Sequence, residues 1–381
     1  MSWSTALGLL AVAIWLYLLL GRGGFWLARE RDGDSTATVA RWPRVTAVVP
    51  ARNEADVIEQ SIGSLLRQDY PGPFRVVLVD DGSDDGTADR ASRASGGGLD
   101  LLRGSPLPAG WTGKVWAQHQ GVSHALASDD KPDYLLLTDA DIGHAPDNLR
   151  ALVTQAESQS LVLVSSMVEL SCRGWAERFL IPAFVFFFQM LYPFAWVADR
   201  NRPIAAAAGG CMLVRREALE RVGGMASIRA EIIDDCALAR QLKGRGPIWL
   251  GLTRRARSLR PYEGLREIGR MVSRTAYAQL DYSPLLLAGT VAGMAITYLV
   301  PAVLALFGQG LSQPAGLAAW LLMAVAFQPV LRFYRVSPLW GFALPAIAAA
   351  YTAFTVQSAI AVWRGQGGQW KGRAQARMGE S

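Results

Sequence analysis

The chain has 381 residues, a formal net charge of +6 and hydrophobic residues at 51% of its positions. Its length allows one sizeable soluble domain, and its apolar content indicates additional membrane segments. The basic residues gather beside apolar runs and no DNA-reading motif is present, so we expect a membrane surface and exclude nucleic acid as a partner. Three cysteines, Cys172, Cys211 and Cys236, lack CxxC spacing and indicate packing roles in a reducing compartment.

The N-terminal segment is predicted to anchor the chain in a membrane. Residues 1–21 are uncharged and apolar, and they are long enough to span a bilayer. Arg22, Arg29 and Arg31 follow, so the positive-inside rule places the next domain in the cytoplasm. Residues 22–43 form the expected linker to that domain.

A strand, a helix and a second strand come next, in the pattern of a parallel βαβ unit. Residues 45–49 are mostly β-branched, and the strand is expected to stop at Pro50. Asn53 is expected to cap the following helix. The second strand covers residues 76–79. This pattern predicts an α/β domain over residues 44–260.

A third strand, Tyr134–Thr138, ends in two acids separated by one small residue. Asp139 and Asp141 would lie at the carboxyl end of a sheet strand, where open α/β sheets bind ligands. Carboxylate oxygens suit a hard divalent cation, Mg2+ or Mn2+, that also holds phosphates. A loop with two solvated acids is the plainer alternative. A fourth strand is expected at 161–165.

Three other groups are expected at the same sheet edge. Asp80 and Asp81 end the second strand, where they can accept hydrogen bonds from a nucleotide base or a ribose. Pro50-Ala51-Arg52-Asn53-Glu54 follows the first strand and faces the same edge. Lys114 follows a glycine turn and can pair with a diphosphate or with neighbouring carboxylates. The plainer alternatives are an Asp-rich turn, a helix cap and an exposed loop lysine.

A second acidic pair, Asp234-Asp235, opens an amphipathic helix. One carboxylate is a candidate general base that takes the proton from an acceptor hydroxyl as it attacks a sugar carbon, while a metal at Asp141 stabilises the departing diphosphate. The alternative is structural, since acidic side chains at the N-terminus of a helix are stabilised by the helix dipole. His144 is a candidate extra metal ligand, with a loop histidine as the favoured alternative.

The C-terminal half is predicted to be mostly membrane-associated. Residues 179–198 are uncharged and are expected to lie in the interface or re-enter one leaflet, with a buried core helix as the alternative. Residues 261–282 form an amphipathic interface region. Residues 283–363 predict two or three spans, and 364–381 form a basic tail. Three complete spans would place that tail outside, against the positive-inside trend, so the number of spans stays open.

A set of motifs occurs in fixed order over residues 45–245: Val49-Pro50-Ala51-Arg52-Asn53-Glu54, Val79-Asp80-Asp81-Gly82-Ser83, Gly113-Lys114, Asp139-Ala140-Asp141, Gly209–Arg216, and Asp234-Asp235 with Leu238. This ordered set resembles family 2 glycosyltransferases of the GT-A fold. The resemblance implies an α/β GT-A domain with a Rossmann-like mixed sheet and a nucleotide-diphosphate sugar donor, a UDP-sugar first. It also implies that Asp81 contacts the nucleotide base, that Asp139 and Asp141 bind ribose and metal-diphosphate, and that Asp235 is the base of an inverting transfer.

More narrowly, the segments Phe186–Phe194, Gly251–Arg255 and Ser273–Pro284 resemble the hopene-associated glycosyltransferases of bacteria. That resemblance implies a hopanoid lipid acceptor, hopanoid-synthesis proteins as partners and a multi-pass location in the bacterial cytoplasmic membrane. Arg270 and Arg274 would then lie near the lipid head group. Polyprenyl phosphate is the alternative acceptor, and a non-catalytic membrane scaffold of the same fold is the alternative function.

The chain departs from wider family patterns at two places. The acid pair before the acceptor helix is usually Glu-Asp and is Asp234-Asp235 here, which keeps Asp235 in position. The Gln-x-x-Arg-Trp signature of processive polysaccharide synthases is missing from the neighbourhood of Arg270 and Arg274. We therefore expect a single transfer to a lipid rather than polymer synthesis.

Overall fold

The computed structural model describes residues 2–33, 39–367, 369–370 and 373–374, and the chain divides into two compact units. The sheet unit comprises Glu30–Leu170, Trp196–Arg260 and Gln369–Ser381, and the helical unit comprises Met1–Arg29, Ser171–Ala195 and Pro261–Gly368. Parts of the expected linker (34–38) and of the basic tail (368, 371–372 and 375–381) lie outside the described residues.

The sheet unit is built on one eight-stranded mixed sheet with the order β3-β2-β1-β4-β7-β6-β8-β5. The first four strands are parallel, β7 runs antiparallel to both β4 and β6, and β5 runs antiparallel to β8. The mixed α/β sheet expected from the sequence is therefore confirmed. The strands are β1 (Val45–Ala51), β2 (Phe74–Asp80), β3 (Leu99–Arg103), β4 (Tyr134–Thr138), β5 (Ile142–His144), β6 (Leu163–Glu169), β7 (Cys211–Arg215) and β8 (Ile248–Ser258).

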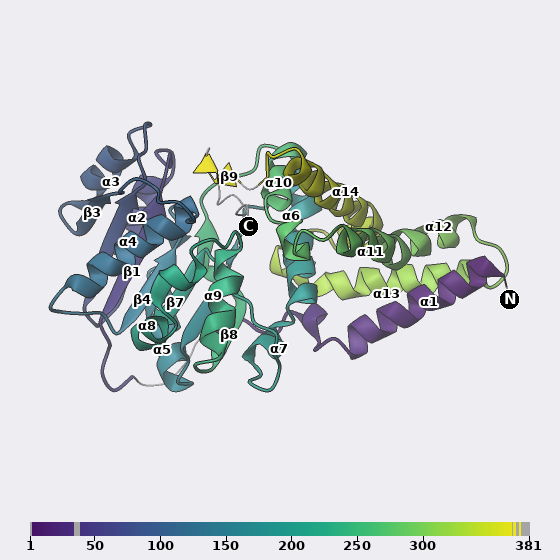
Figure 1. The fold of residues 1–381 in the computed structure, drawn as a ribbon. Helices are drawn as coiled ribbons and strands as arrows, with labels where there is room; N and C mark the ends of the chain where they lie inside the picture. The colour runs from purple at the N-terminus through teal and green to yellow at the C-terminus, as the bar shows by residue number, and fades with distance from the viewer. Residues whose placement is uncertain (1, 34–38, 368, 371–372, 375–381) are drawn as a thin grey trace. The chain divides into compact units, whose positions relative to one another are not determined.

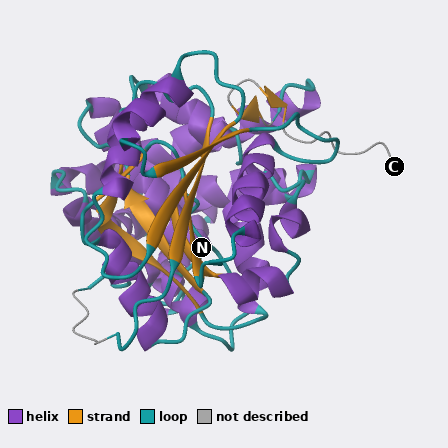
Figure 2. Cartoon of the chain, turned by 90° about the vertical axis from the view of Figure 1, so that its left-hand side faces the viewer, coloured by secondary structure: helices purple, strands orange, loops and turns teal. Residues whose placement is uncertain are grey.

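Helices pack along this twisted sheet (Figure 2). Gly121 of α4 lies so close to the sheet that an added Cβ would be 2.5 Å from Val48 Cγ1 and 3.0 Å from Val79 Cγ2. Glycine at this position therefore sets how closely α4 approaches β1 and β2. The helices of the sheet unit are α2 (Ile58–Leu66), α3 (Thr87–Ser95), α4 (Gly113–Ala127), α5 (Asn148–Ser158), α8 (Arg216–Arg221), η2 (Gly224–Ile228) and α9 (Asp234–Lys243).

Two local expectations around the first strand were wrong. Strand β1 continues through Pro50 to Ala51. Its pairing with β4 ends at Val48, so no backbone N–H of residue 50 is required for a hydrogen bond to β4. Asn53 does not cap α2, which begins at Ile58. Its backbone has φ 52° instead, and its Oδ1 accepts a hydrogen bond from Asp84 N at 3.1 Å.

A strap made of Glu30, Arg31 and Asp32 extends the sheet beside β8. The Asp32 N–H donates to Leu252 O at 3.0 Å, and Leu252 N donates back to Glu30 O at 2.9 Å. The Asp32 carboxylate accepts hydrogen bonds from Thr253 Oγ1 at 2.5 Å and from Arg255 Nη1 at 3.1 Å. This strap joins the sheet unit to the N-terminal helix.

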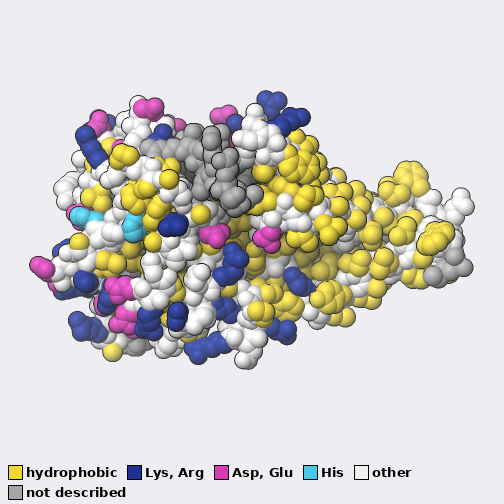
Figure 3. Space-filling model, viewed as in Figure 1, with side chains coloured by type: hydrophobic (Ala, Val, Ile, Leu, Met, Phe, Trp, Pro, Cys, Tyr) yellow, Lys and Arg dark blue, Asp and Glu magenta, His cyan; other side chains and the backbone are white. Residues whose placement is uncertain are grey.

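Among its described residues, the helical unit has four segments that are long and apolar enough to cross a membrane, namely Trp3–Leu20, Pro284–Phe307, Ser312–Phe333 and Pro338–Trp363. Hydrophobic side chains dominate the visible surface over α1, α12 and α13 (Figure 3), and α13 packs against both other helices (Figure 1). The helices are α1 (Trp3–Leu20), η1 (Phe25–Leu27), α6 (Trp175–Leu191), α10 (Leu265–Ser273), η3 (Ala278–Leu280), α11 (Pro284–Met294), η4 (Ala295–Leu299), α12 (Val300–Phe307), α13 (Ser312–Phe333), η5 (Pro338–Ala343) and α14 (Leu344–Trp363).

Residues 179–198 are divided between α6 and a short helix α7 (Phe194–Ala198). Helix α6 contains Pro182 and packs against α10, α13 and α14 within the helical unit. Most of its side chains are buried, and Tyr351 OH of α14 donates to Leu180 O at 2.9 Å. The C-terminal strands β9 (Gln369–Trp370) and β10 (Arg373–Ala374) form a separate antiparallel pair.

The segment 338–363 begins beside the last third of α13 and reaches the middle of that helix at Phe342. Trp320 Nε1 donates to Phe342 O at 3.1 Å, and Gln328 Nε2 donates to Pro338 O at 3.1 Å. Helix α13 continues from Trp320 to Phe333, so these contacts lie up to about 20 Å before its end at the helical rise of ~1.5 Å per residue. The start of α14 is therefore level with the middle of the bundle.

The other end of α14 packs beside α10 and the beginning of α11 (Figure 1). Tyr277, Leu287 and Ala359 share one buried cluster, and Tyr277 N donates to Ser358 Oγ at 3.1 Å. Leu287 lies in the first turn of α11, which starts at Pro284. Helix α14 thus ends at the same end of the bundle at which α11 begins.

Candidate functional site

The candidate site lies at the carboxyl edge of the parallel strands. Strand β1 ends at Ala51, β2 ends at Asp80 and β4 ends at Thr138, immediately before Asp139. These strands are neighbours in the order β2-β1-β4, so the residues that follow them gather at one edge. Helices α4 and α9 begin at the same place, and they carry Lys114 and the Asp234-Asp235 pair in their first turns.

The loops after β1 and β2 are tied together by hydrogen bonds. The Arg52 guanidinium donates to the carbonyls of Asp81 and Gly82, and its Nη1 lies 4.0 Å from the buried Asp81 Oδ2. Asp80 Oδ1 accepts a hydrogen bond from Ser83 N at 3.2 Å, so Asp80 also holds its own turn. Pro50 and Ala51 form the end of β1 and take part through their backbone, and Ala51 O accepts a hydrogen bond from Asp81 N at 2.8 Å.

Lys114 joins the acids that follow β4 to the acids that open α9. Its Nζ lies 2.9 Å from Asp139 Oδ1 and 3.3 Å from Asp234 Oδ2, and its side chain is 16% exposed. Burial alone would lower the pKa of Lys114, but the carboxylates of Asp139 and Asp234 outweigh burial and hold that pKa above its usual value. The lysine is therefore a mostly buried, ion-paired cation in the first turn of α4 rather than an exposed loop residue.

Asp235 is held beside this ion pair by two backbone donors. Its Oδ2 accepts from Gly209 N at 2.8 Å, and its Oδ1 accepts from Cys236 N at 2.7 Å. Burial, together with the charge of Asp234, raises the pKa of Asp235 to about 6. A carboxylate that is fixed in position and titrates near neutral pH can act as a general base.

Asp141 lies in a second charged group with Glu54 and Arg260. Arg260 forms an ion pair with Glu54, and the Asp141 carbonyl accepts from Leu259 N at 2.8 Å. Burial, with the carboxylates of Asp139 and Glu54, raises the pKa of Asp141 to about 6 despite the opposing charge of Arg260. Sequence reasoning missed Arg260 because no motif surrounds it and its partner Glu54 is distant in the chain.

The donor set around Asp139 and Asp141 fits a divalent cation that is shared with a substrate. Both side chains offer carboxylate oxygens, and the carboxylates of Asp139 and Glu54 add to the effect of burial on the pKa of Asp141, so a cation here would offset repulsion between these acids. Within the described part of the chain, no three His, Cys, Asp or Glu side chains converge on one metal position. The remaining ligands would therefore come from phosphate oxygens and water, as is usual for Mg2+.

His144 is a buried structural residue rather than a solvated loop histidine. Its Nδ1 lies 2.9 Å from Asn148 Nδ2 and its Nε2 lies 3.0 Å from Thr138 Oγ1, so both ring nitrogens are occupied within the protein. Thr138 Oγ1 in turn donates to Gly210 O at 2.7 Å. This chain of hydrogen bonds fixes the end of β4 against the start of β7, directly behind Asp139 and Gly209.

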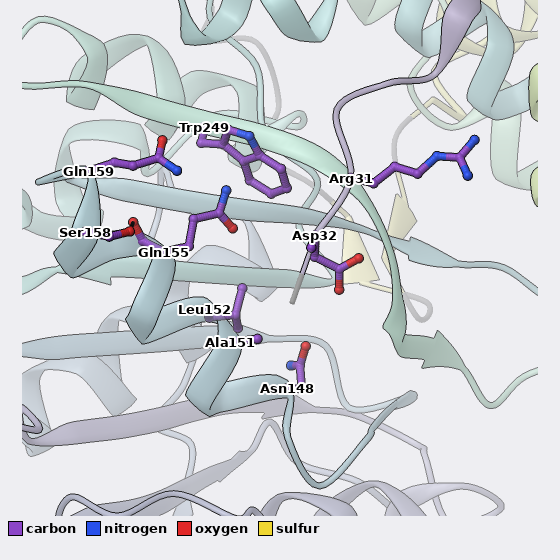
Figure 4. A pocket seen from close by; sticks show the side chains of 10 residues that line it. Arg31, Asp32, Asn148, Ala151, Leu152, Gln155, Ser158, Gln159 and Trp249 are labelled. Atoms are coloured by element: carbon purple, nitrogen blue, oxygen red, sulfur yellow. Dashed lines mark hydrogen bonds between the residues drawn. The ribbon is translucent and has the colours of Figure 1, made fainter. Parts of the chain in front are cut away.

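Two other predicted features, the α10 arginines and the cysteines, lie outside this cluster, and so does a pocket that the sequence did not indicate. Arg270 and Arg274 are exposed at α10 in the helical unit. The cysteines form no disulfide, and burial raises the pKa of the Cys211 thiol to about 12. A separate pocket of about 270 Å³ lies beside α5, lined by residues that include Asp32, Gln155 and Trp249 (Figure 4). None of the predicted site carboxylates lines that pocket.

Comparisons with known proteins bear on the sheet unit. The family model described as "Glycosyl transferase family 2" matches residues 46–223. An N-acetylglucosaminyltransferase from Mesorhizobium japonicum is 27% identical over 189 residues, which cover 47% of this chain and 41% of the relative. A 4,4'-diaponeurosporenoate glycosyltransferase from Staphylococcus aureus is 31% identical over 116 residues, which cover 30% of this chain and 28% of the relative. The chain thus spans less than half the length of these curated relatives.

Among solved structures, a mannosyltransferase from Pyrobaculum calidifontis in complex with GDP-Man and Mn2+ is similar to this chain. The TM-score is 0.56 with 20% sequence identity, and the match covers 95% of this chain and 99% of that chain. At this identity the similarity concerns the fold, and the expected GT-A architecture is confirmed by it.

Proposed function

We propose, from the premise that residues 46–223 form a family 2 glycosyltransferase domain, that the protein is a membrane-bound inverting glycosyltransferase. It moves one sugar from a nucleotide-diphosphate donor to a lipid. The observation that carries the proposal is the contact of Lys114 with both Asp139 and Asp234. This contact brings the acids expected to face the donor and the acids expected to face the acceptor into one cluster.

Asp235 is the proposed base of the transfer. The acceptor hydroxyl oxygen bonds to the anomeric carbon, its proton passes to Asp235, and the bond from that carbon to the diphosphate oxygen breaks. Asp81 and Arg52 are positioned to contact the nucleotide, and Asp80 and Glu54 support the same loops. A divalent cation held by Asp139 and Asp141 would neutralise charge on the departing diphosphate.

The acceptor is proposed to be a hopanoid. The support is the resemblance of the aromatic and arginine-containing segments to hopene-associated glycosyltransferases, and one curated relative is named for transfer to diaponeurosporenoate. Arg270 is exposed on α10 and Arg274 is exposed directly after it, in the helical unit that carries the apolar helices. We assign these arginines to the lipid head group, and hopanoid-synthesis proteins are the partners this acceptor implies.

The proposed location is the bacterial cytoplasmic membrane, with the sheet unit facing the cytoplasm. Helix α1 is followed by Arg22, Arg29 and Arg31, which favours the cytoplasmic side for the residues that follow it. Pro284–Phe307 and Ser312–Phe333 then form a hairpin whose two open ends lie on that side.

The segment 338–363 is proposed to re-enter the membrane without crossing it. It reaches the middle of α13 at Phe342, and its end at Ala359 is level with the beginning of α11. A segment that enters and leaves on the same side keeps the basic tail in the cytoplasm. The arrangement would remove the conflict between three C-terminal spans and the positive-inside trend.

The decisive experiment is transfer by the purified full-length protein in detergent. UDP-sugars and GDP-sugars are supplied with Mn2+ or Mg2+, with and without total membrane lipid or a purified hopanoid. Metal-dependent turnover of one donor that rises with lipid would support the enzyme and name its sugar. No turnover of any donor, together with no increase in melting temperature on adding donor and metal, would favour the non-catalytic scaffold.

A further inference from the structure

Lys114 lies where positive charge is needed between the carboxylates of the site. Its Nζ is 2.9 Å from Asp139 Oδ1 and 3.3 Å from Asp234 Oδ2, and Asp235 also contributes to its electrostatic environment. The side chains of Lys114 and Asp234 are 16% and 12% exposed and that of Asp139 is 34% exposed, so solvent screens the contact with Asp234 weakly and the contact with Asp139 in part. Without the ammonium, several carboxylates would face one another across a partly desolvated space.

Asp139 belongs to this lysine pair and also to the carboxylate pair that fits a divalent cation. The ammonium lies against Asp139 Oδ1, so a divalent cation that approaches either oxygen of this carboxylate comes close to it and the two positive charges repel one another. Lys114 would have to withdraw from Asp139 before a cation could bind there. A lysine side chain can do so by rotation about its flexible stem, and a diphosphate offers its ammonium a new anionic partner.

We propose that Lys114 is an internal counter-ion that excludes the divalent cation from Asp139 until the donor diphosphate binds. This inference rests on the proposed function and adds an order of events to it. In the donor-free protein Lys114 neutralises Asp139 and Asp234. When the donor enters, Lys114 transfers its contact to the diphosphate, and Asp139 becomes available to the cation.

Gly209 supports this exchange by leaving space beside the lysine. A Cβ on Gly209 would lie 3.1 Å from Lys114 Nζ and 3.3 Å from Asp235 Oδ2. The lysine head group therefore packs against a glycine on this side. A larger side chain there would restrict the movement that the exchange requires.

The test is Mn2+ binding by the full-length protein in detergent, followed through the electron paramagnetic resonance signal of unbound Mn2+. Wild-type protein and the variants K114M, K114R and K131M are titrated without nucleotide, then with UDP and with GDP. Lys131 is an exposed lysine of the same unit and is the matched control. Melting curves of each variant verify that it is folded.

Without nucleotide, K114M is expected to bind Mn2+ about tenfold more tightly than wild type, because a nearby positive charge has been removed. K114R keeps the charge, so it and K131M are expected to resemble wild type. With UDP or GDP present, K114M should bind that nucleotide about tenfold more weakly, since one contact to its phosphates is lost.

Equal Mn2+ affinity of folded K114M and wild type in the absence of nucleotide would overturn the counter-ion role while leaving the proposed enzyme intact. One other outcome would count against the proposed function itself, and it concerns wild-type protein. If wild type binds no Mn2+ even with UDP or GDP, the metal-assisted transfer fails, and the role of Lys114 fails with it. K114R that binds Mn2+ as tightly as K114M would also reject the charge-based explanation.

Discussion

The backbone N–H of Gly209 donates to Asp235 Oδ2 at 2.8 Å, and this hydrogen bond fixes the orientation of the carboxylate that is the proposed base. A Cβ at Gly209 would meet Asp235 Oδ2 at 3.3 Å and Lys114 Nζ at 3.1 Å, so Gly209→Ala should shift one of these groups by tenths of an ångström. Because small displacements of reacting groups are costly, we expect kcat to fall roughly tenfold or more. The control is Gly98→Ala, whose Cβ would make an ordinary 3.4 Å contact with Leu66. Unchanged kcat in the Gly209 variant would argue against this positioning.

Asp235→Asn should abolish most transfer while leaving donor binding in place. The amide cannot accept the acceptor proton, and loss of a general base typically lowers the rate by about 10²–10⁴-fold. Transfer is measured with labelled donor, and donor binding is measured as the rise in melting temperature with nucleotide and metal. Asp129→Asn, at an exposed position, is the control and should keep full activity. An active Asp235→Asn enzyme would remove this residue from the mechanism.

The rate of transfer should decline on the acid side of about pH 6. Burial and Asp234 raise the pKa of Asp235 to about 6, and a base acts only when ionised, so activity is present above that pH and is lost as the pH falls through it. Asp234→Asn removes one of the charges that raise this pKa and should move the acid limb to lower pH. A pH–rate profile of both proteins checks the shift. An identical acid limb in the variant would contradict the assignment.

His144 should make the sheet unit less stable in mild acid. Burial lowers the pKa of His144 to about 4, whereas an unfolded histidine titrates near ~6.5, so between these values the unfolded state binds the proton. Stability is therefore full above about pH 6.5 and falls towards pH 4, by as much as about 3 kcal/mol. His144→Gln removes this titration. Its melting temperature, although lower at pH 7, should fall less between pH 7 and pH 5 than that of wild type.

The C-terminus should lie in the cytoplasm if 338–363 re-enters the membrane. A fluorescent-protein fusion after Ser381 should then be bright and an alkaline phosphatase fusion there inactive, when expressed in a bacterial host. Fusions after Gln309, in the turn between α12 and α13, are the matched control and should give the opposite pattern. An active phosphatase at Ser381 would mean that the segment crosses completely.

The parts of the fold that sequence reasoning reached are those with strong local patterns. Buried valine-rich runs predicted β1 and β2 and a buried leucine run predicted β4, and the acids that follow β2 and β4 lie at the predicted sheet edge. Strand β3 was missed because Leu99–Arg103 is only partly buried and lacks a continuous apolar run. The Asn53 cap was wrong because the Asn53 side chain bonds across to the next loop instead of to α2.

The contacts within the site depended on distances that no local pattern encodes. The pairing of Arg260 with Glu54 and the donation from Gly209 to Asp235 join residues far apart in the chain. Lys114 was singled out by its glycine turn, but only the structure brings it to Asp139 and Asp234 together. The position of 338–363 along α13 could not be predicted either, because composition indicates the length of an apolar helix but not where it packs along its neighbours.

The strap at Glu30–Asp32 has a consequence for how the protein is made. These residues leave the ribosome early, but their partners Leu252 and Thr253 are synthesised more than two hundred residues later, since Asp32 and Thr253 are 221 positions apart. During that interval β8 has not been synthesised, so the backbone of the strap has no strand to pair with. Contacts of such long range form late in folding. Until translation has passed β8, the strap that follows helix α1 therefore lacks its partner strand, and this unpaired backbone is open to wrong pairing.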